Sequence, residues 1–125
     1  MKKNVKHTIL CIDDDKEFLD SMRLIIEGAG FRMEAAHTAE DGLEKYKTAK
    51  PNLVIVDLMM EEIDSGVNFV KDLKALGPTP PIFMLSSVGD TMNVNVDFSQ
   101  LGLTGILQKP INPDQLVATL KAKLA

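Results

Sequence analysis

Two stretches of this chain are apolar at every position, and each is followed by aspartate. Residues 9–12 lead into Asp13 and Asp14, and residues 53–56 lead into Asp57. Strands that are apolar on both faces are typical of a parallel sheet covered by helices, and ligands bind such sheets at the carboxyl ends of the strands. We therefore expect the three carboxylates to meet at one edge of a sheet. Because clustered carboxylates repel one another and resist desolvation, this pattern favours a site for a hard divalent cation.

Two later apolar stretches add other chemical groups to the same edge. Residues 81–85 lead into Ser86 and Ser87, and residues 105–108 lead into Lys109 and Pro110. If these stretches are also parallel strands, a hydroxyl and an ammonium group join the carboxylates at the carboxyl edge.

The order of an acid pair, a lone aspartate, a hydroxyl and a Lys-Pro dipeptide resembles the receiver domain of two-component response regulators, over essentially the whole chain. The resemblance implies an α/β fold of the flavodoxin-like type. That fold is a doubly wound, five-stranded parallel sheet of order 2-1-3-4-5 with helices on both faces.

Length and composition agree with a single domain over residues 1–125. The chain is 45% hydrophobic, which suffices for one core. We expect a cytoplasmic protein with no membrane partner, because no run of eighteen apolar residues and no signal-peptide pattern is present. One cysteine, Cys11, excludes an internal disulfide, and the net charge of -4 argues against direct binding of nucleic acid.

Helical periodicity and capping residues predict the connecting helices. Apolar stripes are expected in the first helix at Phe18, Leu19, Met22, Ile25 and Ile26, in the third at Phe69, Val70, Leu73 and Leu76, and in the last at Leu116, Val117, Leu120 and Leu124. Thr38 is an expected N-cap with Asp41 three residues on. Asn112, with Pro113 and Gln115, predicts the start of the last helix.

Residues 88–102 depart from this pattern. They are rich in poor helix formers, and Met92, Val94, Val96 and Phe98 alternate as in an extended segment. We expect an atypical fourth helix that is short or begins late. The region belongs to the output surface in the receiver family, so the mode of partner binding is open.

The acid cluster suits Mg²⁺, which takes oxygen ligands in octahedral geometry and keeps several waters. Asp14 and Asp57 fit as direct ligands and Asp13 as a ligand through water. The resemblance adds the backbone carbonyl of Met59. Asp57 is then the expected nucleophile, which attacks phosphorus and forms an aspartyl phosphate.

Lys109 and Ser86 are the other expected catalytic residues. Lys109 should pair with Asp57 at rest and with a phosphoryl oxygen after transfer. Ser86 should donate a hydrogen bond to the phosphoryl group and so move the following loop. Ser87 is a neighbouring hydroxyl, but Ser86 occupies the position at which the family has Thr or Ser. The bond between Lys109 and Pro110 is expected to be cis, as the resemblance implies.

Several positions depart from the family. Glu61 stands where proline is common, and the loop of residues 61–66 is one residue longer. Ile106 replaces the aromatic switch residue. The resemblance implies that Met59 and Val88 flank the phosphoryl position, and both are apolar, so neither can hydrogen-bond the attacking water. We therefore expect slow autodephosphorylation.

These observations predict a phospho-acceptor switch, not an enzyme, that takes a phosphoryl group from a histidine kinase or phosphotransfer protein and acts on an unknown downstream protein. One alternative is a phosphorylation-independent adaptor. Another is a phosphatase of the haloacid dehalogenase type. Members of that class have two aspartates two residues apart after the first strand, and Asp13 and Asp15 imitate this spacing, although the chain is short for that class. Asp15 by itself is most simply an acid at the start of a helix.

Overall fold

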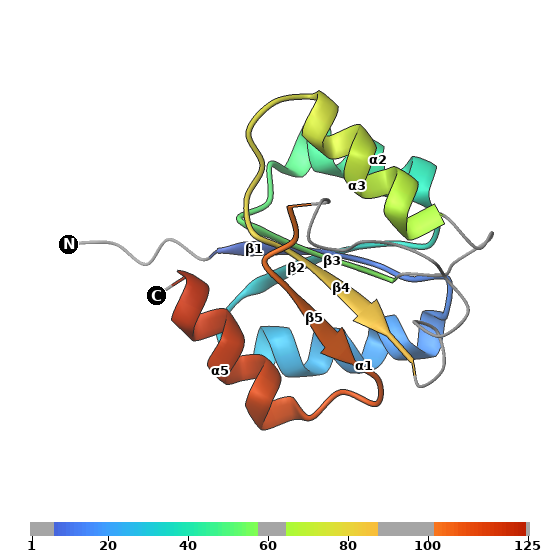
Figure 1. Ribbon diagram of the computed structural model, residues 1–125. Coiled ribbons are helices and arrows are strands. Elements are labelled where there is room, and N and C mark those ends of the chain that lie inside the picture. The colour runs from blue at the N-terminus through green and yellow to red at the C-terminus, as the bar shows by residue number, and fades with distance from the viewer. Residues whose placement is uncertain (1–6, 58–64, 88–101, 125) are drawn as a thin grey trace.

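The computed structural model describes residues 7–57, 65–87 and 102–124, in which strands and helices alternate along the chain (Figure 1). The elements, in chain order, are β1 (Thr8–Ile12), α1 (Lys16–Gly28), β2 (Arg32–Ala36), α2 (Ala39–Ala49), β3 (Leu53–Asp57), α3 (Ser65–Ala75), β4 (Ile82–Ser86), β5 (Gly105–Gln108) and α5 (Pro113–Leu124).

The strands form one parallel sheet in the order β2-β1-β3-β4-β5, which confirms the predicted topology. β1 and β3 lie side by side with Ile12 opposite Val56, so the acids that follow Ile12 and Val56 leave the sheet at the same edge. β4 continues the sheet with Asp57 opposite Leu85, and Ser86 lies opposite Gln108 of β5. The register therefore brings all four predicted strand ends to one edge.

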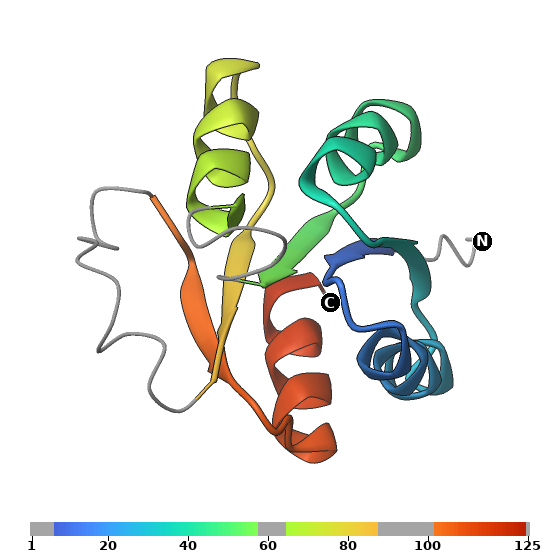
Figure 2. The ribbon, with the colours of Figure 1, turned by 90° about the vertical axis from the view of Figure 1, so that its right-hand side faces the viewer.

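Helices cover both faces of the sheet, as predicted. Figures 1 and 2 show α2 and α3 on one face and α1 and α5 on the other. Each face has its own apolar cluster, and β1 and β3 contribute to both because their side chains alternate between the two faces. Buried members of the first cluster include Leu10, Val56, Phe69, Val70 and Leu73, and those of the second include Ile9, Ile55, Leu19, Leu116 and Leu120.

Side-chain caps begin three of the helices. Asp15 caps α1 by accepting hydrogen bonds from the backbone N–H groups of Glu17 and Phe18. Thr38 caps α2 by accepting from Asp41, as expected. Asn112 accepts from the backbone N–H of Gln115 at the start of α5, at 3.0 Å. Each cap satisfies backbone donors that the first turn of a helix leaves without partners.

The apolar stripes are largely as predicted, with one error. Leu76 follows the end of α3 and is 56% exposed, because the helix ends at Ala75 and the chain turns away through Gly77, whose φ is +127°. Val117 and Leu124 of α5 are only partly buried. The predicted fourth-helix region (residues 88–101), most of the 61–66 loop, Met59 and Val88 lie outside the described residues. Within the described ranges, no helix has the length and apolar character needed to cross a membrane.

Candidate functional site

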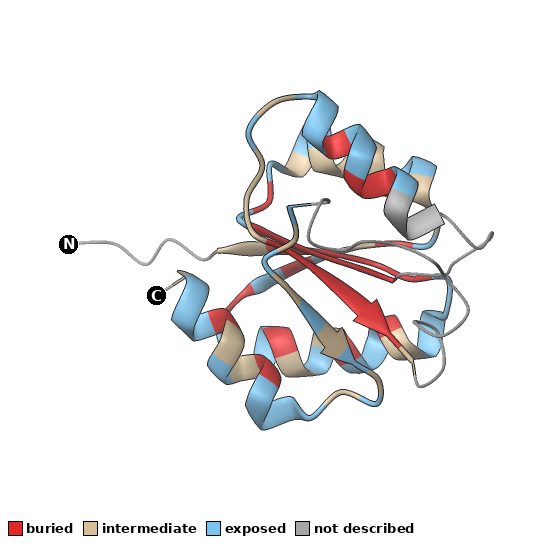
Figure 3. Ribbon diagram, in the orientation of Figure 1, coloured by how far each residue is buried: buried red, intermediate tan, exposed pale blue. Residues whose placement is uncertain are grey.

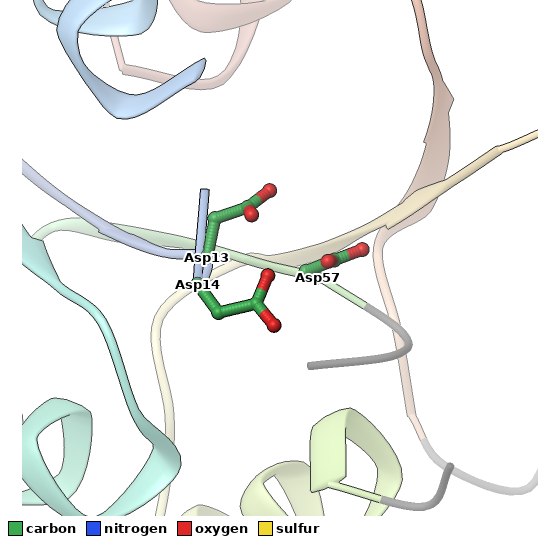
Figure 4. A group of neighbouring side chains, drawn as sticks. All are labelled: Asp13, Asp14 and Asp57. Atoms are coloured by element: carbon green, nitrogen blue, oxygen red, sulfur yellow. The ribbon is translucent and has the colours of Figure 1, made fainter. Parts of the chain in front are cut away.

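Asp13, Asp14 and Asp57 come together at the carboxyl edge of the sheet, as the sequence predicts. Figure 4 shows the three side chains at the ends of two neighbouring strands. One carboxylate oxygen from each residue lies within 4.8 Å of the others. Asp13 and Asp57 are buried, whereas Asp14 is exposed. An arrangement of three carboxylates with one open side can hold a hard cation that also keeps water or ligand oxygens.

Asp13 is the most constrained of the three acids. It is 0% exposed, and its backbone N–H donates to the carbonyl of Ala36, which continues the pairing of β1 with β2. Its Oδ1 accepts a hydrogen bond from the backbone N–H of Asp15 at 2.9 Å, and its Oδ2 accepts from Nζ of Lys109 at 2.7 Å. Because both oxygens are engaged by the protein, this geometry suits the predicted contact of Asp13 with a metal through water.

Lys109 directly follows β5, the strand at one edge of the sheet, and reaches the acids from there. Its backbone N–H donates to the carbonyl of Ser86, and the following bond to Pro110 is cis, as predicted. The ammonium group lies 3.6 Å from Oδ2 of Asp57, so the expected ion pair is present, although the shorter contact is with Asp13. The sequence did not predict the contact with Asp13.

The surroundings of Lys109 keep it charged. Partial burial lowers the pKa of its ammonium group, but the hydrogen bond to Asp13 and the charge of Asp57 raise it by more, and the pKa lies above the ordinary lysine value. The ring of Phe18 covers another side of the ammonium group, with 4.4 Å from Nζ to the ring centroid. Helical periodicity predicts for Phe18 only a place in the apolar stripe of α1. Its place in the first turn, directly after the acid cluster, was the available signal.

Ser86 is the last residue of β4 and is buried, and its hydroxyl donates to the carbonyl of Ser87 at 3.3 Å. A contact of that length is a weak hydrogen bond. Ser87 is only partly buried. Ser86 thus ends the strand that pairs with β3, the strand of Asp57, and the preference for its hydroxyl over that of Ser87 stays a prediction.

Comparisons with known proteins identify a family and a shared fold. A family model described as the response regulator receiver domain matches residues 9–121. The transcriptional regulatory protein ZraR of Escherichia coli is 30% identical to this chain over 117 residues, which are 94% of this chain and 26% of that protein. The response regulator MprA of Mycobacterium ulcerans is 29% identical over 116 residues, 93% of this chain and 49% of that protein. The chain thus spans less than half the length of each relative.

Solved structures agree with the sequence relatives. A CheY-like response regulator receiver domain protein of Methanospirillum hungatei is 30% identical, with a TM-score of 0.81 and coverage of 96% of this chain and 94% of that one. The chemotaxis response regulator CheY4 of Vibrio cholerae is 27% identical, also with a TM-score of 0.81, and the match covers 96% of this chain and 100% of that one.

Proposed function

The chain belongs to the response regulator receiver domain family, whose members act in phosphorylation-based two-component signalling, and on that premise we propose that Asp57 accepts a phosphoryl group from a histidine kinase or phosphotransfer protein. The observation that supports this proposal is the set of three carboxylates within 4.8 Å of one another, with a lysine ammonium at 3.6 Å from Asp57. Asp57 ends a fully buried central strand, so its carboxylate is held in one place.

The reaction is an in-line displacement. A carboxylate oxygen of Asp57 attacks the phosphorus of a phosphohistidine, the P–N bond breaks, and its electron pair stays on the imidazole nitrogen. Lys109 stabilises the added negative charge, because its hydrogen bond can pass from Asp13 to a phosphoryl oxygen. Ser86 donates to another phosphoryl oxygen once its weak hydrogen bond to Ser87 is exchanged.

The residues present fit Mg²⁺, which the receiver family binds. Asp14 and Asp57 would be direct ligands and Asp13 would contact the ion through water, while the carbonyl of Met59 lies outside the described residues. When bound, the ion neutralises negative charge on the transferring phosphoryl group. The formal charge of the three carboxylates and Lys109 together is negative, which favours a divalent cation over an anion at this cluster.

The partners follow from the same chemistry. The donor is a histidine kinase or phosphotransfer protein, and the output is the binding of another protein. Although relatives are named as transcriptional regulators, this domain itself carries a net charge of -4, which disfavours direct contact with nucleic acid. Slow autodephosphorylation remains part of the proposal, and it depends on Met59 and Val88.

The alternative of a phosphorylation-independent adaptor depends on residues 88–102, almost all outside the described ranges. Binding of the downstream partner with and without phosphoryl labelling distinguishes the two functions, because an adaptor binds equally in both states.

Intact mass after incubation with acetyl phosphate and Mg²⁺ tests the proposal. The wild-type chain should gain one phosphoryl group, and Asp57→Asn should gain none because the nucleophilic oxygen is lost. Asp20→Asn is the matched control, since Asp20 is an exposed acid of α1 whose side chain is 66% accessible. Stoichiometric labelling of Asp57→Asn would overturn the assignment of Asp57, and transfer from a phosphorylated histidine kinase is the second measurement.

A further inference from the structure

Phe18 joins the acid cluster from a helix that carries none of the expected catalytic residues. It lies in the first turn of α1, where its backbone N–H donates to the capping carboxylate of Asp15 at 3.3 Å. The cap fixes the start of the helix beside the strand end that holds Asp13. From this position the ring covers Nζ of Lys109, 4.4 Å from the ring centroid.

The ammonium group therefore has attractive partners of two kinds. Carboxylate oxygens of Asp13 and Asp57 lie at 2.7 and 3.6 Å, and the electron-rich face of an aromatic ring attracts the same charge. The Lys109 side chain is only 20% exposed, so water screens these interactions less than on an open surface. A lysine stem is flexible, and holding it in one place costs conformational entropy that such contacts offset.

We propose that Phe18 is a positioning residue for Lys109. Its ring holds the ammonium group at the acid cluster, but it has no oxygen that competes with the phosphoryl group for the hydrogen bonds of Lys109. A carboxylate directs the ammonium to a particular oxygen. The face of an aromatic ring also attracts a cation, but it has no acceptor atom that fixes the direction of a hydrogen bond. Lys109 can thus exchange its hydrogen bond from Asp13 to another oxygen while the ring still favours its presence at the cluster.

The consequence for phosphorylation depends on the proposed function, whereas the contact itself does not. If Lys109 must stabilise charge that develops on the phosphoryl group, a ring that keeps the ammonium in place raises the fraction of molecules ready to react. Loss of the ring face should slow phosphorylation about two- to tenfold, the range expected for one partly exposed cation–π contact.

Phe18 also packs against the apolar cluster of the α1 face, so the test must separate packing from ring electronics. Replacing Phe18 by pentafluorophenylalanine keeps an aromatic ring but withdraws electron density from its face. Phe18→Leu removes the ring, and Phe18→Trp keeps an electron-rich face. Phe31→Leu is the matched control, because Phe31 is a buried residue of the same cluster and its ring contacts His7.

The first measurement uses the chain without Mg²⁺ or phosphodonor. The order parameter of the Lys109 ammonium group, from ¹⁵N relaxation at low temperature, should fall in the pentafluorophenylalanine and Phe18→Leu proteins. It should stay at the wild-type value in Phe18→Trp and Phe31→Leu. An unchanged order parameter in the pentafluorophenylalanine protein would overturn the proposal, whatever the effect of Phe18→Leu on stability.

The second measurement is the rate of labelling by acetyl phosphate with Mg²⁺. The pentafluorophenylalanine and Phe18→Leu proteins should both be slower by the factor given above, and Phe31→Leu should keep the wild-type rate even if it is less stable. Equal rates for Phe18→Leu and wild type would overturn the role in phosphorylation. If the wild-type chain is not labelled at all, the proposed function fails, and the order parameter still decides whether Phe18 positions Lys109.

Discussion

The strands β1, β3 and β5 each lead to a charged residue at the carboxyl edge of the sheet, here called the rim. The central strands β1 and β3 differ from the edge strand β5 in how deeply they are buried. β3 is buried at all five positions, and β1 is buried from Ile9 to Ile12. β5 alternates between partly buried and exposed residues and pairs with β4 at the edge of the sheet (Figure 3). The acids thus follow strands that are buried almost throughout, whereas Lys109 follows a strand with fewer buried side chains, which suits the change of partner that we propose for it.

The largest expected difference between these regions is in thiol reactivity. Burial raises the pKa of the Cys11 thiol in β1, so the reactive thiolate is almost absent at neutral pH. A cysteine placed in β5 by Ile106→Cys, in a Cys11→Ala background, is exposed. We expect Cys11 to react with an alkylating reagent at least about a thousandfold more slowly, because labelling requires unfolding. Alkylation rates within tenfold of each other would contradict the expected difference between the buried thiol in β1 and the exposed thiol in β5.

The second expected difference is the loss of stability when one isoleucine of each strand is truncated to alanine. Ile55 of β3 is 0% exposed and Ile106 of β5 is 41% exposed. Ile55→Ala should lower the free energy of unfolding by about 3 kcal/mol, because it removes buried contacts and leaves a cavity. Ile106→Ala should cost less than about 1 kcal/mol. Urea denaturation measures both, and equal losses would show that β5 is as well packed as β3.

Alkaline pH provides a third comparison. In the unfolded chain the Cys11 thiol ionises near its ordinary pKa of about 8.5, but burial keeps it protonated in the folded chain. The folded state then binds more protons, so its stability falls as pH rises above that value. Between pH 8.5 and 10 the wild type should lose about 1.6 kcal/mol more than Cys11→Ala. The Cys11→Ala, Ile106→Cys protein should show no such loss, because its thiol titrates similarly in both states.

The smallest expected effect concerns the rim itself. Mg²⁺ at ten times its dissociation constant should raise the free energy of unfolding by about 1.4 kcal/mol, because the ion binds only the folded acid cluster. Asp14→Asn should remove this increase. Asp15→Asn should keep it, since Asp15 lies next to the cluster but serves as a helix cap, a role that Asn also fills. Thermal unfolding with and without Mg²⁺ measures each case, and loss of the effect in Asp15→Asn would place the ion elsewhere.

Local patterns made most of the fold predictable. The apolar runs that end in Asp13 and Asp57 specify parallel strands buried on both faces, and a parallel sheet brings those ends to one rim. Thr38 and Asn112 marked the starts of their helices because a cap depends on residues a few positions apart. These features are recorded in neighbouring residues, so one sequence suffices to find them.

The contacts that were missed join distant parts of the chain. Lys109 lies nearer to Asp13 than to Asp57, and Phe18 covers its ammonium group. Periodicity assigned Phe18 to the core face of α1, which is correct but incomplete, because a residue at the end of such a stripe can face the rim as well. Leu76 was misplaced because helical spacing continued beyond the point where α3 ends. Side-chain reach and helix ends depend on tertiary packing, which spacing does not encode.

The pairing of α1 with α5 on one face of the sheet has a consequence for synthesis on the ribosome. Leu19 and Met22 of α1 share an apolar cluster with Leu116 and Leu120 of α5, although the two helices are almost the whole chain apart. During translation the α1 face remains uncovered until α5 has left the exit tunnel. A nascent chain that stalls before α5 therefore presents an apolar surface to chaperones, and we expect the sheet to acquire its final stability only after α5 has been synthesised.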